Sequence, residues 1–180
     1  RYIGVTGVQT CALPIYNPEA ELPQGAQEAS GVPEVIRAVR EQAGAGADWI
    51  KVYADYRVGP DGSTRPTFSL EELKALVDTA HSSGRPVSAH ASSDEGMRRA
   101  VLAGVDTIEH GYGGSEATFK LMAEKGMFLT ANLVAYYAMK ERAAEFGMNG
   151  DMLAKNDLVI DGGLRSLEIC KRAGVPVAYG

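Results

Sequence analysis

Apolar positions along the chain from Gly31 onward repeat with two spacings, one typical of helices and one typical of buried strands. Ser69 and Glu72 form a capping-box pattern that marks one helix start. The residues between 55 and 67 contain turn-forming GPDGS and are expected to form a long, functional loop. The spacing predicts helices at residues 32–42, 69–83, 94–104, 115–126, 135–146 and 155–173, and strands at 48–54, 85–90, 105–111, 127–133 and 175–180.

The predicted order is five strands, each after the first preceded by a helix. Strict alternation of this kind predicts an α/β fold with a parallel sheet, either open and doubly wound or curved into a barrel. A complete (β/α)₈ barrel needs about 250 residues. A chain of 180 residues is therefore expected to hold at most the latter five strands of such a barrel.

The first residues have a different character. Val5 to Ile15 read VTGVQTCALPI, which matches the translation of a common sequencing adapter. We therefore expect residues 1–15 to be an artefact and exclude them from the fold, with 16–30 as a linker and 31–180 as the carboxy-terminal part of the barrel. The alternative is a genuine strand with a turn at Pro14. Under the artefact interpretation Cys11 is not native, Cys170 is the single native cysteine, and the chain is a fragment.

Polar residues at the carboxyl ends of the predicted strands carry the candidate chemistry, because ligands bind at those ends in parallel sheets. Lys51 shares a strand face with Trp49 and Tyr53, and that face would point into a barrel. A buried ammonium is costly without a partner. Three interpretations stay open at this point: a lysine that reaches solvent or an acid, a Schiff-base amine, or a carbamylated lysine that binds metal.

Two histidines end the next two predicted strands. His90 and His110 are 20 residues apart, one βα repeat, so we expect them at neighbouring strand ends, where imidazole nitrogens suit zinc or a similar ion. Alternation then turns Glu109 toward the helices, unless the strand kinks before Gly111. His81 is expected to be a solvated cation at a helix end.

These motifs resemble a known family. GADWIKVYA, GRPVSAHA, EGMRRAVLAGVDTIEHG and AGVPVAYG are similar to the amidohydrolase superfamily, nearest to its imidazolonepropionase-related and Xaa-Pro dipeptidase-like branch. The resemblance implies strands four to eight of an incomplete (β/α)₈ TIM barrel. It also implies that Lys51 is carbamylated and bridges two divalent metals, usually zinc, and that His90 and His110 bind one of them.

The resemblance further implies hydrolysis of carbon–nitrogen bonds in amides, cyclic amides or dipeptides through a metal-activated hydroxide. The family's His-x-His pair is expected upstream and its general-base aspartate just after Gly180, so no catalytic residue is retained. The isolated chain is expected to be inactive and to aggregate or oligomerise. Candidate substrate-binding residues are Tyr53, Tyr56, Arg57 and Tyr136, although packing over the barrel mouth explains each aromatic side chain as well.

Composition narrows the alternatives. A net charge of −5 gives no reason to expect nucleic acid or an anionic membrane as a partner, and 45% apolar residues are typical of a globular domain. A barrel that forms a Schiff base through Lys51, like class I aldolases, would not require the two histidines. A non-catalytic α/β module is the third possibility. Compartment, metal identity and substrate stay open.

Overall fold

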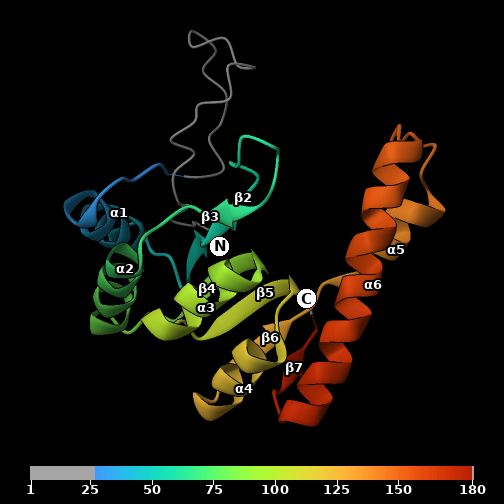
Figure 1. The fold of residues 1–180 in the computed structure, drawn as a ribbon. Coiled ribbons are helices and arrows are strands. Elements are labelled where there is room, and N and C mark those ends of the chain that lie inside the picture. The colour runs from blue at the N-terminus through green and yellow to red at the C-terminus, as the bar shows by residue number, and fades with distance from the viewer. Residues whose placement is uncertain (1–26, 180) are drawn as a thin grey trace, which may run out of the picture.

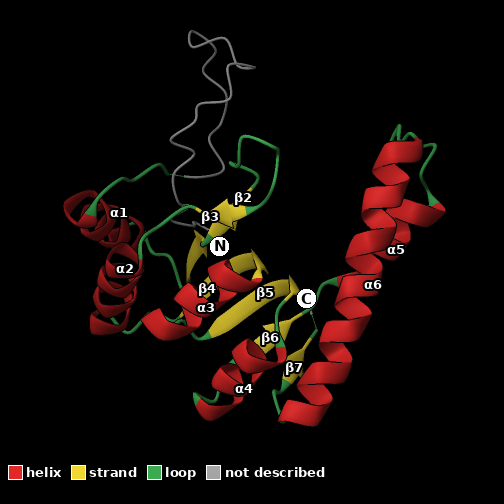
Figure 2. Ribbon diagram, in the orientation of Figure 1, coloured by secondary structure: helices red, strands yellow, loops and turns green. Residues whose placement is uncertain are grey.

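Residues 27–179, which the computed structural model describes, form a parallel sheet with helices packed on one face (Figures 1 and 2). The sheet order is β1-β4-β5-β6-β7, and β2 and β3 pair separately as an antiparallel hairpin. The strands are β1 (Ile50–Tyr53), β2 (Asp55–Tyr56), β3 (Arg65–Pro66), β4 (Val87–Ser93), β5 (Thr107–Gly113), β6 (Phe128–Thr130) and β7 (Val177–Ala178). The helices are α1 (Val32–Gly44), α2 (Leu70–Ser82), α3 (Asp94–Ala103), α4 (Glu116–Glu124), α5 (Leu133–Glu141) and α6 (Gly150–Ala173).

The predicted alternation of strand and helix is confirmed, and so is the capping box at the start of α2. The Ser69 side chain accepts a hydrogen bond from the Glu72 amide, and the Glu72 carboxylate accepts one from the Ser69 amide. These two bonds satisfy amide groups that have no partner inside the helix. The capping box thereby fixes where the chain leaves the hairpin and enters α2.

Two segments differ from the sequence-based prediction. The expected loop at 55–67 contains the β2–β3 hairpin. The last long helix begins at Gly150 rather than near Lys155, because the Asn149 side chain accepts a hydrogen bond from the Met152 amide and caps it. The preceding helix is shorter than expected and ends at Glu141.

The two faces of the sheet differ sharply in chemistry. Ile50 and Val52 of β1, Ile108 of β5 and Leu129 of β6 are fully buried against the helical layer. On the helical side the largest buried partners are Leu73, Leu76, Met97, Phe119 and Met122. The opposite face carries the polar side chains of the strands, so the helices bury one face and leave the other for chemistry.

Strand β5 ends in an unusual conformation that shapes this second face. His110 has φ 71° and Gly111 has φ 61°, both in the left-handed region. A Cβ atom at Gly111 would lie 2.6 Å from the Leu129 side chain, which is fully buried. The turn of the strand and the close packing below it therefore both require glycine at this position.

Some sequence-based expectations fall outside the described residues. The adapter-like segment 1–15, most of the linker and Cys11 all precede residue 27. Cys170 lies within the structure and is buried. Among the helices in residues 27–179, none is long and apolar enough to cross a membrane.

We expect Gly111→Ala to destabilise the fold by about 1–3 kcal/mol more than Gly84→Ala does, because overpacking adds to the cost of the left-handed backbone. Gly84 is the matched control: its φ is 71°, yet a Cβ atom there would meet nothing within 4 Å. Urea unfolding of both variants measures the difference. Equal losses of stability would show that the contact with Leu129 does not constrain β5.

Candidate active site

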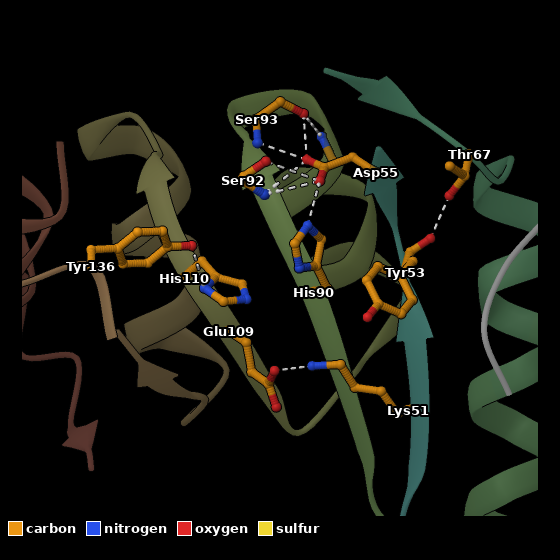
Figure 3. Close-up of polar contacts among 11 residues, drawn as sticks. Lys51, Tyr53, Asp55, Thr67, His90, Ser92, Ser93, Glu109, His110 and Tyr136 are labelled. Atoms are coloured by element: carbon orange, nitrogen blue, oxygen red, sulfur yellow. Dashed lines mark hydrogen bonds and ion pairs between the residues drawn. The ribbon is translucent and has the colours of Figure 1, made fainter. Parts of the chain in front are cut away.

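Parallel pairing brings polar residues of three strands onto one face of the sheet. Lys51 pairs in register with Ser88, and Tyr53 pairs with His90. On the next strand His90 pairs with Glu109. Because residues in register share a face, these five side chains point away from the helices, as Figure 3 shows for all but Ser88.

Lys51 forms an ion pair with Glu109 across the width of β4 (Figure 3). The Ser88 hydroxyl donates a second hydrogen bond to the Glu109 carboxylate, at 2.8 Å. Burial lowers the pKa of Lys51, and the Glu109 carboxylate acts in the opposite direction. Burial also raises the pKa of Glu109, but the hydrogen bond and charge of Lys51 outweigh it and leave that pKa below its usual value. Of the interpretations left open for Lys51, the structure therefore shows a lysine paired with an acid, and that acid is Glu109.

His90 and His110 lie side by side, with ring centroids 4.7 Å apart (Figure 3). Burial lowers the pKa of His90 to about 4, helped by the nearby Lys51 charge. Burial likewise lowers the pKa of His110 to about 4, with repulsion from His90 and Lys51 contributing. Both rings are therefore neutral at pH 7, and a neutral imidazole keeps the lone pair that a metal needs.

Of the two arrangements that the sequence left open for Glu109, the structure has the kinked strand and not regular alternation. Alternation along the strand was expected to turn Glu109 toward the helices once His110 pointed inward, but Glu109 lies on the same face as Lys51 and Ser88. His110 is the displaced residue, since its left-handed φ of 71° swings its side chain onto that face. The strand does kink, at His110 itself, and the kink places two consecutive polar side chains together.

Asp55 is a component of the site that the sequence analysis missed. Its side chain is fully buried, and its carboxylate accepts hydrogen bonds from the backbone amides and hydroxyls of both Ser92 and Ser93, at 2.6–3.2 Å. His90 Nε2 lies 3.7 Å from Asp55 Oδ1. The one sequence signal was an aspartate next to a predicted strand end, which is also common in ordinary turns.

Of the proposed substrate-binding residues, the three tyrosines lie around the two histidines. The Tyr53 ring is 4.8 Å from the His90 ring, and Tyr56 is 6.5 Å from it, both between centroids. The Tyr136 hydroxyl lies 3.3 Å from His110 Nδ1, so this side chain contacts a candidate ligand directly. Arg57 is exposed beside Tyr56 in the hairpin.

His81 takes no part in this arrangement. It lies in the last turn of α2, and its Nε2 is 2.9 Å from Asp106 Oδ2. The same Asp106 oxygen accepts a hydrogen bond from the Val87 amide, at the start of β4. His81 therefore belongs to the amino end of the sheet, opposite the candidate site.

The donor set fits part of a divalent metal centre. Among residues 27–179, no three His, Cys, Asp or Glu side chains are grouped so as to hold a metal by themselves. His90 and His110 nevertheless offer two neutral nitrogens at neighbouring strand ends, which suit a divalent metal. A third, anionic ligand would arise if the Lys51 amine left Glu109 and were converted to a carbamate.

We expect Glu109→Leu to lower the free energy of unfolding by about 2 kcal/mol, because it leaves the Lys51 ammonium partly buried without its partner. The loss is smaller than for a fully buried ion pair, because both side chains are partly exposed. The double variant Lys51→Met/Glu109→Leu should recover most of this loss. Glu41→Gln, which breaks an exposed ion pair with Arg37 on α1, is the matched control and should change little. Chemical unfolding measures all three variants, and a double variant less stable than the single one would contradict the pairing.

The two histidines should make stability depend on pH. Their pKa of about 4 in the folded chain lies below the ordinary value of 6.5, so the unfolded chain binds more protons between these values. Stability that is present above pH 6.5 is therefore lost as the pH falls toward 4. Urea unfolding across this range should show a shallower loss for the double variant His90→Gln/His110→Gln. If the free energy of unfolding falls equally with pH in the double variant and in the unsubstituted chain, the two rings are not buried in their neutral form.

Comparisons with known proteins identify the family of this chain. The model of the amidohydrolase family matches residues 6–180. Ochratoxinase of Aspergillus niger is 36% identical over 154 residues, which are 84% of this chain and 32% of that protein. The chain spans 32–39% of the length of the curated relatives that it matches.

Solved structures show the same fold. A prolidase in complex with N-methylphosphonate-L-proline superimposes with a TM-score of 0.80 and 35% identity, covering 98% of this chain and 46% of the prolidase. A Xaa-Pro dipeptidase with bound methionine gives a TM-score of 0.73 and 30% identity, over 85% of this chain and 38% of the dipeptidase. The five-stranded sheet is thus an incomplete TIM barrel, and the chain belongs to the amidohydrolase family.

Proposed function

We propose that this chain contributes the lysine and two histidines of a metal-dependent hydrolase that cleaves amide, cyclic amide or dipeptide bonds. The observation that carries the proposal is the pair of neutral imidazole rings, 4.7 Å apart on neighbouring strands, on the face that Lys51 shares. Two neutral rings side by side at the carboxyl ends of parallel strands, where barrels bind their ligands, favour a role in ligand binding. The family assignment independently favours hydrolysis.

The two histidines and the lysine would have different roles. His90 and His110 would hold one divalent metal, zinc or a similar ion, and a carbamate on Lys51 would be an anionic ligand between two such ions. A bound metal would polarise the carbonyl group of the substrate and would lower the pKa of a bound water molecule, so that this water is deprotonated near neutral pH. A carbamate would form when the neutral Lys51 amine adds carbon dioxide and releases a proton, so the amine must first lose its charge and separate from Glu109. Burial lowers the pKa of Lys51 and so favours the neutral amine.

The substrate side of the site would be formed by Tyr53, Tyr56, Arg57 and Tyr136. The aromatic rings surround the histidines, and Arg57 supplies a cation on the hairpin next to them. A cation of this kind suits a substrate with a free carboxylate, such as a dipeptide. The prolidase, Xaa-Pro dipeptidase and ochratoxinase names of similar proteins support a small amide substrate.

The activity is proposed for a protein that also supplies the remaining groups of the family's site. The three histidines of this sequence are His81, His90 and His110, so the chain contains no His-x-His pair. We therefore propose that the isolated chain binds metal weakly and does not turn over substrate. Residues 31–180 would be the portion of the barrel that carries these ligands.

Metal titration of the 180-residue chain tests this function. In the presence of bicarbonate, Co²⁺ should bind with the absorption of a nitrogen- and oxygen-ligated ion, and His90→Ala or His110→Ala should weaken binding at least about tenfold. His81→Ala is the control, because His81 lies at the opposite end of the sheet. Identical binding by all three variants, or turnover of an acyl-proline dipeptide by the chain alone, would contradict the proposal.

A further inference from the structure

Asp55 is the most thoroughly buried charged group near the candidate site, and the proposed chemistry does not use it. Its carboxylate is fully shielded from solvent and is held by two serine amides and two serine hydroxyls. These four donors hold the carboxylate in one orientation.

We propose that Asp55 is a positioning residue, which keeps the proton of His90 on Nε2 and so presents Nδ1 as the ligand nitrogen. Oδ1 of Asp55 lies 3.7 Å from His90 Nε2, and no other ring nitrogen is paired with this carboxylate among the described residues. At this distance the two atoms are not hydrogen-bonded, but a carboxylate oxygen repels a lone pair and attracts an N–H, so the proton is favoured on the ring nitrogen that faces it. This tautomer does not depend on the proposed function, whereas its role in metal binding does.

The carboxylate cannot easily move away from the ring. Ser93 caps α3 by accepting a hydrogen bond from the Gly96 amide, and the same hydroxyl donates to Asp55 Oδ2. A Cβ atom at Gly96 would lie 2.3 Å from Asp55 Oδ2, which shows how closely the helix packs on the carboxylate. Asp55 is the first residue of β2, and its side chain is therefore fixed against the first turn of α3.

The second nitrogen of His90 points away from Asp55, toward the side on which His110 lies (Figure 3). His110 has the opposite arrangement of its two nitrogens. Its Nδ1 lies 3.3 Å from the Tyr136 hydroxyl, so Nε2 is the nitrogen available to a metal. The two rings would thus offer different nitrogens to one ion. Partners of this kind orient a histidine ligand and raise its basicity.

The tautomer can be read directly by ¹⁵N NMR of the metal-free 180-residue chain, labelled at histidine, at pH 7.5. The sequence contains only three histidines, and single His→Gln variants assign them. We expect His90 to carry its proton on Nε2. A His90 ring protonated on Nδ1 in the unsubstituted chain would overturn the proposal, whatever the variants show.

Asp55→Asn gives the sharper test. The asparagine oxygen can keep accepting from the serines, and its NH₂ group then faces the ring and needs an acceptor, so His90 should switch to the Nδ1–H form. Asp94→Asn is the matched control: Asp94 accepts from the Ser115 amide and the Thr118 hydroxyl at the start of α4, away from both rings. A purely structural role for Asp55 would lower stability without changing the tautomer, and that result would refute positioning.

Zinc titration separates this inference from the proposed function. Asp55→Asn should weaken zinc binding about 10–100-fold relative to Asp94→Asn. Zinc binding equal in both variants would overturn the assigned role in the metal site. If the unsubstituted chain shows the Nε2–H form but binds no zinc, the proposed function fails while the positioning by Asp55 is supported.

Discussion

The register of three parallel strands is the constraint on which the rest of the site depends. Because side chains alternate, pairing Lys51 with Ser88 and His90 with Glu109 places all four on one face, and the helices bury the other. A shift of a single residue in either pair would turn polar groups into the apolar core. The hydrophobic contacts below the sheet therefore fix the geometry of the chemistry above it.

One local departure from this regularity completes the arrangement. His110 lies in register with Ala91, whose side chain is buried in the core, so regular strand geometry would point the imidazole into the helices. The left-handed backbone at His110 reverses that direction. Backbone strain of this kind persists only where surrounding contacts enforce it, and Gly111 packed against Leu129 is such a contact.

Much of this could be predicted from the chain itself. The helical and strand spacings predicted the order of elements, and the strand-end positions predicted that His90 and His110 are neighbours. Alternation along the strand placed Lys51 on the inward face. The direction of the His110 side chain, relative to that of Glu109, could not be predicted, because it depends on a left-handed backbone at one non-glycine residue. Asp55 was missed for a related reason: its partners Ser92 and Ser93 are 37 and 38 residues away and meet it only after β1 and β4 pair.

The hairpin between β1 and α2 is attached at both of its ends, and its tip at residues 59–63, closed by a hydrogen bond from the Gly59 amide to the Ser63 carbonyl, lies between these attachments. Asp55 anchors one end, and at the other the Thr67 amide and hydroxyl donate to the backbone carbonyls of Ala54 and Tyr53. The tip between these anchors can therefore change in length or sequence without disturbing the histidines. Evolution could in this way alter what the protein accepts while the ligand-bearing strands are conserved, which makes the hairpin a natural place for related enzymes to diverge.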